Sequence, residues 1–381
     1  MKKHNEKIYY HFFGLVRSIG PITLKKLLDK YGSIKSCYEI VTQSPNNLGG
    51  LLSETMIAEI IKIRDSLDLF KSYEELQEEE IDIIENSDKD FPKLLKEIHD
   101  TPPFLYYKGN KESLNPKLPL AVVGTRKPSA YGTLAVHRLT KDLVNAGATI
   151  ISGLALGIDS IAHIQTIENK GSTIAVVGSG LDKDSIYPKQ HWQLSEEIIK
   201  NGGAIISEYP PKTPSLKHHF PIRNRIISGI CKGVIIIEAK ESSGTLITAK
   251  HALEQNRDVF ALPGSIFSET SIGPLNLITQ GAIPITSSQT ILSHYPSESV
   301  NIESSVTQEN PLTPTEEKIL KFFGDSIISI DELIKKTELT SNIILPSIAM
   351  LSLKGSITKI DDLHYAKRSQ KSKPNLTRNQ L

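Results

Sequence analysis

The middle of the chain contains short apolar runs rich in β-branched residues, separated by longer segments with helical periodicity. Continuous apolar runs are typical of strands buried on both faces, and the amphipathic segments between them supply crossover helices. Six runs recur about every 24 to 31 residues: Leu120–Val123, Thr149–Ile151, Thr173–Val177, Ala204–Ile206, Val234–Ile237 and Val259–Leu262. The pattern predicts an α/β fold with a doubly wound, mostly parallel, Rossmann-like sheet.

Two further apolar runs extend this core toward the N-terminus. Ile81–Ile84 and Phe104–Tyr107 predict short strands among Pro-rich loops, so the expected core covers residues 80–290. From 291 to 315 the composition shifts to Ser, Thr, Pro, Asn and Glu without periodicity, which is typical of a linker.

Residues 1–75 show helical spacing interrupted by glycine and proline, which predicts a small helical module. The stretch from Ile19 to Leu28 resembles one half of a helix-hairpin-helix or SAM-like element. The amides of such a turn bind a DNA phosphate at a helix N-terminus in some proteins. Two interpretations therefore stay open here, a DNA contact and a module that only packs on the core.

Residues 316–366 predict three helices followed by a two-stranded hairpin, which is a winged-helix pattern. The third predicted helix, residues 342–353, carries little charge, so DNA binding and protein binding both stay open. The basic, polar residues 367–381 predict a disordered tail.

Composition limits the function classes. The 381 residues carry a net charge of +1, so any polyanion site must be local. Cys37 and Cys231 lie far apart without metal or redox spacing, and this predicts reduced thiols in a cytoplasmic protein. The sequence shows neither a signal peptide nor an apolar run of membrane-spanning length, so no membrane association is expected.

One window of the core departs from this charge balance. No Asp or Glu occurs from Tyr209 to Ile237, whereas five cations do: Lys212, Lys217, Arg223, Arg225 and Lys232. Phe220 adds an aromatic ring to the cations, and single-stranded nucleic acid needs charge for its phosphates and rings for its bases. A solvated basic loop with one anchoring Phe is the alternative interpretation.

Small and polar residues follow the predicted strands. In doubly wound sheets ligands bind at the carboxyl ends of the strands, where glycine lets backbone amides approach phosphates. The expected ligand edge contains Gly124, Thr125 and Arg126 after the first strand, Ser152 and Gly153 after the second, and Gly178 and Gly180 after the third. Tight turns also need glycine, so a purely structural explanation stays open.

Signatures of catalysis are missing from the sequence. It contains no P-loop, no dinucleotide fingerprint after the first strand, and no zinc-type motif, so we expect no cofactor, no metal and no catalytic residue. Asp159 and His163 are four residues apart, and two interpretations stay open. They form an acid–base pair, or Asp159 caps a helix while the hydrogen bonds of His163 are satisfied inside the protein. Glu208 and Glu238 serve either as functional carboxylates or as partners of helix termini, Arg126 and Arg223.

Several motifs occur in the order typical of one family. They are Gly124-Thr125-Arg126, Ser152-Gly153 with Asp159 and His163, Gly178-Ser179-Gly180-Leu181-Asp182 with Tyr187-Pro188, Phe220-Pro221 with Arg223-Asn224-Arg225, and Ser243-Gly244-Thr245. Together they cover roughly residues 119–285, and the chain resembles the DprA/Smf family of DNA-processing proteins. The helical N-terminal module and the winged helix also match that family's architecture.

The resemblance implies a protein that is not an enzyme. Members bind and protect single-stranded DNA during natural transformation, help to load a RecA-type recombinase, and act as homodimers through the Rossmann core. It also implies that Arg126, Lys217 and Phe220 hold the strand, with Arg223, Asn224 and Arg225 beside them. The alternative is a nucleotide phosphoribohydrolase on a related core, which Glu238 and Ser243-Gly244-Thr245 resemble faintly.

Overall fold

The structure is a computed structural model that describes residues 6–44, 48, 50–297, 312–323, 327–353, 356–359 and 364–367. The chain divides into two compact units, residues 1–302 and 303–381. The linker predicted at 291–315 therefore falls largely outside the described residues. No helix in the described ranges is long and apolar enough to cross a membrane.

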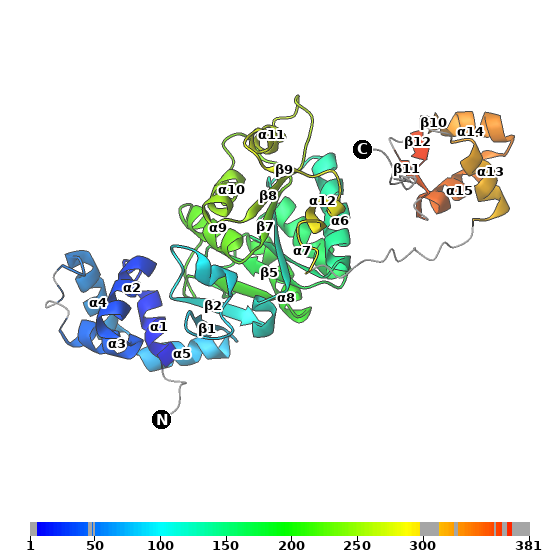
Figure 1. Cartoon of the computed structure of the whole chain (residues 1–381). Helices are drawn as coiled ribbons and strands as arrows, with labels where there is room; N and C mark the ends of the chain where they lie inside the picture. The colour runs from blue at the N-terminus through cyan, green and yellow to red at the C-terminus, as the bar shows by residue number, and fades with distance from the viewer. Residues whose placement is uncertain are drawn as a thin grey trace. The chain divides into compact units, whose positions relative to one another are not determined.

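A sheet forms the centre of the first unit (Figure 1). Its nine strands have the order β1-β2-β6-β5-β4-β3-β7-β8-β9. Its strands are β1 (Asp82–Glu85), β2 (Phe104–Gly109), β3 (Leu118–Val123), β4 (Ala148–Ser152), β5 (Thr173–Val176), β6 (Ala204–Ser207), β7 (Gly233–Ile236), β8 (Asp258–Ala261) and β9 (Ile283–Pro284). The pairs from β6 across to β9 are parallel, while β1 and β2 are antiparallel to their neighbours. The mostly parallel α/β fold predicted from the sequence is confirmed.

The chain reverses its direction across the sheet at β3. From β3 it proceeds through β4 and β5 to β6, and then returns to place β7 on the other side of β3. The helices of this core are α6 (Ala130–Asn145), α7 (Ile158–Glu168), α8 (Trp192–Lys200), α9 (His219–Gly229), α10 (Gly244–Glu254), α11 (Ile272–Thr279) and α12 (Ser288–Leu292). The switch point between β3 and β7 is where ligands bind in this class of sheet.

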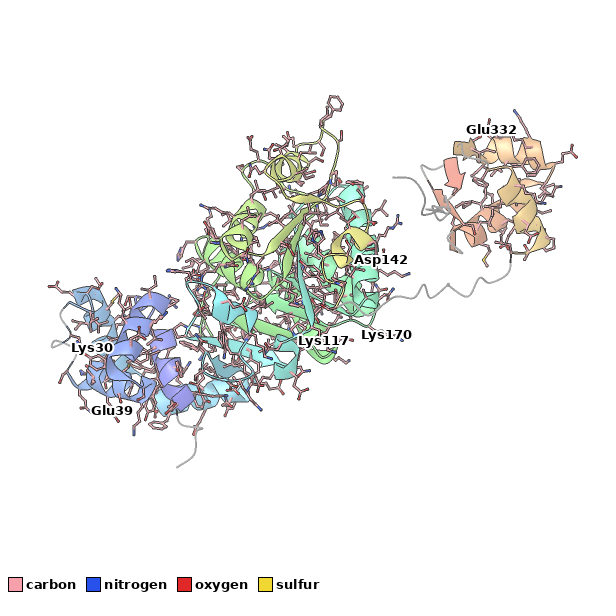
Figure 2. All side chains as sticks on the ribbon, viewed as in Figure 1. Lys30, Glu39, Lys117, Asp142, Lys170 and Glu332 are labelled. Atoms are coloured by element: carbon pink, nitrogen blue, oxygen red, sulfur yellow. The ribbon has the colours of Figure 1, made fainter. Side chains whose placement is uncertain are left out.

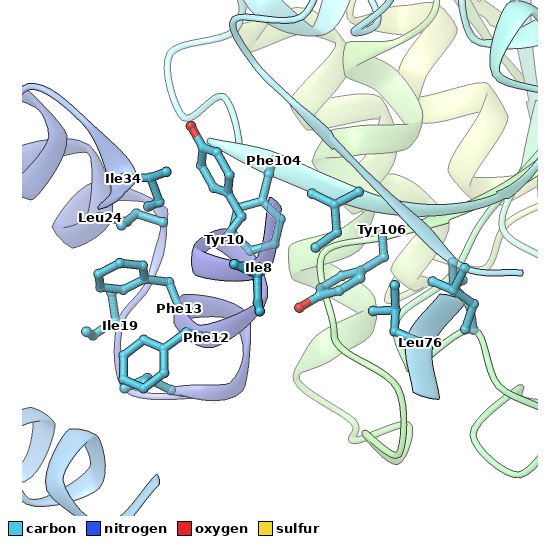
Figure 3. Packing of buried hydrophobic residues seen from close by; sticks show 14 of the residues in the cluster. Ile8, Tyr10, Phe12, Phe13, Ile19, Leu24, Ile34, Leu76, Phe104 and Tyr106 are labelled. Carbon is cyan, nitrogen blue, oxygen red and sulfur yellow. The ribbon is translucent and has the colours of Figure 1, made fainter. Parts of the chain in front are cut away.

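The N-terminal helices pack on the antiparallel end of the sheet. They are α1 (Glu6–Leu15), α2 (Pro21–Tyr31), α3 (Ile34–Gln43), α4 (Glu54–Ser66) and α5 (Leu69–Glu78). Tyr10 and Phe13 of α1 share one apolar cluster with Phe104 and Tyr106 of β2 (Figure 3). A Cβ atom at Gly14 would lie 2.1 Å from the Tyr106 hydroxyl oxygen, so glycine permits this close approach.

Polar contacts join the same surfaces. The Lys7 ammonium lies 2.6 Å from a carboxylate oxygen of Asp82, and His11 Nδ1 lies 3.1 Å from the Tyr106 hydroxyl. Burial lowers the pKa of His11 to about 4, so its imidazole is neutral at pH 7. The helical module is thus part of the same compact unit as the sheet, and its charged side chains such as Lys30 and Glu39 point outward (Figure 2).

The second unit combines three helices with a small sheet. Its elements are α13 (Pro314–Lys321), β10 (Ile327–Ser329), α14 (Ile330–Thr337), α15 (Ser341–Leu353), β11 (Ile357–Lys359) and β12 (His364–Lys367). The strands are antiparallel in the order β10-β12-β11. Ser329 and Glu332 (Figure 2) form a capping box at the start of α14. The sequence predicted the helices and the hairpin but missed β10, and the tail beyond Lys367 lies outside the described residues.

Candidate nucleic-acid interface

The first turn of α9 brings the main predicted contact residues together. The Phe220 ring centre lies 5.5 Å from the guanidinium carbon of Arg126, which comes from the loop after β3. Tyr187, from the segment after β5, places its ring 5.9 Å from the ring of Phe220. Lys217 stands two residues before the start of α9. Residues from three separate segments therefore surround one half-buried aromatic ring.

The two outer cations of this group are exposed. Within the described part of the chain, neither Arg126 nor Lys217 has an ion-pair partner. Their charges are therefore available to a solvent-borne anion, and a guanidinium next to an aromatic ring suits a phosphate beside a stacked base.

Many polar groups of the small residues at the predicted ligand edge have internal partners. The Ser152 hydroxyl donates to the Val122 carbonyl at 2.7 Å, and the amide of Gly180 donates to the Thr213 carbonyl at 2.9 Å. The Gly178 carbonyl lies 3.1 Å from His219 Nδ1. The Thr125 amide donates to the Glu238 carbonyl at 2.7 Å. Most of these residues are buried in the core, and Gly124 begins the loop that carries Arg126.

Arg223 is directed inward rather than toward solvent. It is 4% exposed and donates from Nη1 to the carbonyls of Gly153, at 2.7 Å, and Val176. Burial lowers its pKa to about 10, against the opposing effect of Asp159, so the guanidinium stays charged at neutral pH. A Cβ atom at Gly153 would lie 2.6 Å from Nη2 of Arg223, which explains glycine at this position.

Arg225 is also buried and forms an ionic cluster of its own. Its Nη2 contacts Glu208, its Nε lies 3.2 Å from an Asp100 carboxylate oxygen, and its Nη1 donates to the Asp100 carbonyl at 2.9 Å. Asn224 donates from Nδ2 to the Gly244 carbonyl at 3.2 Å, which joins α9 to the start of α10. The predicted Arg223-Asn224-Arg225 motif therefore lies next to Phe220, but all three side chains have internal partners.

The two carboxylates that the sequence analysis singled out, Glu208 and Glu238, also have hydrogen-bond or ion-pair partners inside the protein. Glu238 is 2% exposed and accepts from the Ser129 amide at 2.9 Å and the Ser129 hydroxyl at 2.6 Å, at the start of α6. Glu208 pairs with Arg225 rather than with Arg126 or Arg223. Of the two roles left open for these carboxylates, the structure favours the helix terminus for Glu238 and an arginine partner, though a different one, for Glu208.

Asp159 and His163 are held apart by different partners. Asp159 accepts from the Gly153 amide at 3.1 Å, while His163 Nδ1 lies 2.7 Å from the Thr173 hydroxyl. Burial raises the pKa of Asp159 and lowers that of His163 to about 3. Gly157 rather than Asp159 is the N-cap of α7. In the described ranges, no group of three His, Cys, Asp or Glu side chains is placed to hold a metal ion.

Two tyrosines near the site, Tyr187 and Tyr209, were not among the site residues predicted from the sequence. Tyr187 is 45% exposed and stands against Phe220, and its only sequence signal was its place in the Tyr187-Pro188 motif. His219 stacks on Tyr209 with ring centres 4.0 Å apart, and this pair lies on the side of α9 that faces the N-terminal helices. No spacing in the sequence joins residues 187 and 209 to residue 220.

Two family models match this chain. The family model described as DNA recombination-mediator protein A matches residues 82–296, and the model of the DprA winged helix domain matches residues 303–361. The chain belongs to the DprA/Smf family. The second match identifies the smaller unit as a winged-helix domain and confirms that prediction.

Relatives of this DprA/Smf chain cover most of its length. Protein Smf of Synechocystis sp. is 33% identical over 96% of this chain and 100% of its own length. DNA processing protein DprA of Bacillus subtilis is 45% identical over 59% of this chain and 74% of its own.

Two solved DprA structures share the fold. The X-ray structure of DNA processing protein A from Streptococcus pneumoniae has a TM-score of 0.63 and 37% identity, and the match covers 77% of this chain and 98% of that one. DNA processing protein A from Helicobacter pylori, whose structure was described for its single-stranded DNA binding mode, has a TM-score of 0.52 and 31% identity. That match covers 58% of this chain and 97% of the other.

Proposed function

We propose that this DprA-family protein binds single-stranded DNA at the first turn of α9, protects it, and helps to load a RecA-type recombinase during natural transformation. The observation that carries the proposal is the exposed guanidinium of Arg126, whose carbon lies 5.5 Å from the ring centre of Phe220, with a second exposed cation, Lys217, shortly before Phe220 in the chain. Arg126 is proposed to bind phosphate with its guanidinium fork, and Lys217 to act as a point charge on a neighbouring phosphate. Phe220 is proposed to stack on a base, which is sequence-tolerant because every base has a π-face.

The chemistry of the second turn supports a scaffold role for the remaining motif residues. Arg223, Asn224 and Arg225 are proposed to fix α9 so that Phe220 faces Arg126, rather than to contact phosphate themselves. Gly124, Thr125, Ser152, Gly153, Gly178 and Gly180 are proposed to form the floor on which the strand lies. Rigid support of contact residues is what a preformed site requires.

The finer setting follows from the family resemblance and from the cysteines. We propose a homodimer through the Rossmann core and a RecA-type recombinase as protein partner, both on the basis of the resemblance. A cytoplasmic location is proposed because Cys37 and Cys231 are both free and buried, as in proteins of reducing compartments.

A hydrolase function is less well supported at the switch point. A nucleotide phosphate would bind at the start of α6 if backbone amides were free there to donate hydrogen bonds. The carboxylate of Glu238 already accepts hydrogen bonds from the amide and hydroxyl of Ser129 at this position. We therefore propose that the protein is not an enzyme. Chromatography of nucleoside monophosphates incubated with the protein tests this, and release of free base would overturn it.

The test of the DNA site is a pair of matched arginine variants. Arg126→Ala is expected to weaken binding of a fluorescent oligothymidylate by roughly tenfold, because a charge-assisted contact is lost. Arg138→Ala removes the same charge from an exposed position in α6, the helix that follows the loop of Arg126, and should change the affinity little. Both should keep the wild-type melting temperature. Equal affinities for Arg126→Ala and Arg138→Ala would contradict the proposal.

A further inference from the structure

A second aromatic ring stands beside Phe220 and is not one of the contacts proposed above. Tyr187 is 45% exposed, and its ring centre lies 5.9 Å from that of Phe220. Its hydroxyl has no hydrogen-bond partner in the part of the chain that the structure describes. The side chain therefore adds nothing to the polar network of the core, although it touches the proposed DNA site.

The backbone on both sides of Tyr187 is fixed by the core. The preceding residue, Ile186, is 1% exposed, and its amide donates to the carbonyl of Asp182 at 3.2 Å. On the following side, Nδ1 of His191 lies 2.8 Å from the carbonyl oxygen of Leu154. The exposure of the tyrosine ring is thus not that of a loose loop. An aromatic group that is already held in place loses little conformational entropy when a ligand binds to it.

The orientation of the two rings shows that they cannot both stack on one base. The planes of Tyr187 and Phe220 are inclined by 56°. Stacking brings two flat faces nearly parallel to each other, so a base that is parallel to one of these rings is steeply inclined to the other. Two rings arranged in this way fit two bases, one on each ring.

The distance between the rings suits a single strand better than a duplex. Successive nucleotides of one duplex strand are about 3.4 Å apart along the axis. Ring centres 5.9 Å apart, with inclined planes, require two neighbouring bases that are spread apart and tilted against each other. A strand without a partner can adopt this arrangement, whereas a duplex must first lose base pairs and stacking.

We propose that Tyr187 stacks on the nucleobase next to the one on Phe220, so that the two rings together bind a dinucleotide step of single-stranded DNA. This inference rests on the proposed function and extends its site to the segment after β5. Arg126 contacts a phosphate on the Phe220 side of the step. The second ring adds affinity without sequence preference, because every base has a π-face, and it favours single strands over duplexes.

Tyr187→Leu is the first test, because it removes the ring and keeps an apolar side chain. We expect the affinity for oligothymidylate to fall roughly fivefold or more with an unchanged salt slope, since stacking releases no counterions. Tyr187→Phe keeps the ring and should keep the wild-type affinity. The matched control is Tyr131→Leu: Tyr131 in α6 is 51% exposed, but its hydroxyl donates to the Pro263 carbonyl near the end of β8. That variant should bind like the wild type.

A double variant distinguishes stacking from mere support of Phe220. If Tyr187 stacks on its own base, Tyr187→Leu should lower the affinity further in a Phe220→Leu protein. If Tyr187 only holds Phe220 in place, the loss should vanish in that background, and this result would overturn the inference.

Two other results with the single variants would also overturn the inference and leave the Phe220 site standing. One is an unchanged affinity of Tyr187→Leu. The other is an equal loss in Tyr187→Phe, because the hydroxyl rather than the ring would then be responsible. If the wild type does not bind oligothymidylate at all, the proposed function and this inference fail together.

Discussion

Cationic side chains lie in opposite environments in the second turn of α9 and around its first turn. In and before the first turn, Lys217 is exposed without an ion-pair partner among the described residues, and the half-buried Phe220 faces an exposed Arg126. In the second turn, Arg223 and Arg225 are 4% and 5% exposed and bind carbonyls and carboxylates of the core. One basic motif thus divides into a part that faces solvent and a part that is buried in the core.

This difference shows that a positive charge within a sequence motif does not by itself identify the residues that are free to contact a ligand. Arginine donates in several directions at once, so a buried guanidinium can join strand ends and helices that have no regular hydrogen bonds to each other. Arg223 joins the ends of β4 and β5 to α9 in this way. The predictions below separate the two parts by asking whether a substitution changes stability or affinity.

Arg225→Ala should produce the largest effect, and the effect should be on stability. Removing this guanidinium leaves Glu208, whose side chain is 12% exposed, without its cation. Breaking a buried ion pair on one side costs about 3–5 kcal/mol of unfolding free energy. Urea denaturation measures it, with Arg126→Ala as the control that should change stability by less than about 0.5 kcal/mol. A stable Arg225→Ala protein with weakened DNA binding would reverse the assignment.

Gly153→Ala tests the same support from the backbone side. The new methyl group would lie 2.7 Å from Asp159 Oδ2 and 2.6 Å from Arg223 Nη2, so buried groups must shift at a cost of about 1–3 kcal/mol. Gly244→Ala is the matched control, because no heavy atom lies within 4 Å of its added Cβ. Thermal unfolding of both proteins is the measurement. Equal melting temperatures would show that the contact between Gly153 and Arg223 does not limit stability.

Phe220→Ala should lower affinity rather than stability. Loss of base stacking costs about 1–3 kcal/mol of binding free energy and releases no counterions, so the salt slope should stay unchanged. Phe220→Leu keeps much of the apolar volume and should lose most of the same affinity. The competing view holds that Phe220 anchors the loop. It requires a lower melting temperature together with a flatter salt slope, and that combination would withdraw the stacking role.

Lys217→Ala should have the smallest effect. One point charge on phosphate contributes less than one unit to the slope of log K against log salt, and affinity should fall only a few-fold. Lys200→Ala removes an exposed charge in the last turn of α8, shortly before the amino end of β6, and should leave the slope unchanged. Fluorescence anisotropy at several salt concentrations measures both. Identical slopes for the two variants would remove Lys217 from the site.

The parts predicted from sequence are those with a strong local pattern. The six apolar runs gave the parallel strands within one or two residues, because buried strands leave a continuous apolar signal. Strands β9 and β10, of two and three residues, are too short to leave such a signal. The resemblance to the DprA/Smf family predicted Arg126 and Phe220 in one site, and the structure brings the two side chains together.

What the sequence missed depends on tertiary neighbours. Arg223 and Arg225 lie in a window without acidic residues, yet Arg225 pairs with Glu208 and Asp100, and Arg223 lies near Asp159, all outside that window. A cavity is lined by α1, α2, residues 102–104, residues 208–213 and α9, and no pattern within one of these segments predicts that they meet. The hydroxyl of Thr213 has no hydrogen-bond partner in the described structure, and this too can be known only from its three-dimensional surroundings.

The central claim is that exposed cations and one aromatic ring at the start of α9 bind single strands, and DNA affinity at two salt concentrations tests it most directly. Full-length protein should bind an oligothymidylate more tightly than a duplex of equal length, since α9 offers a ring for unpaired bases. If about three to four phosphates are neutralised, the slope of log K against log salt should be roughly −2 to −3. Equal affinity for the duplex, or an affinity independent of salt, would contradict the claim.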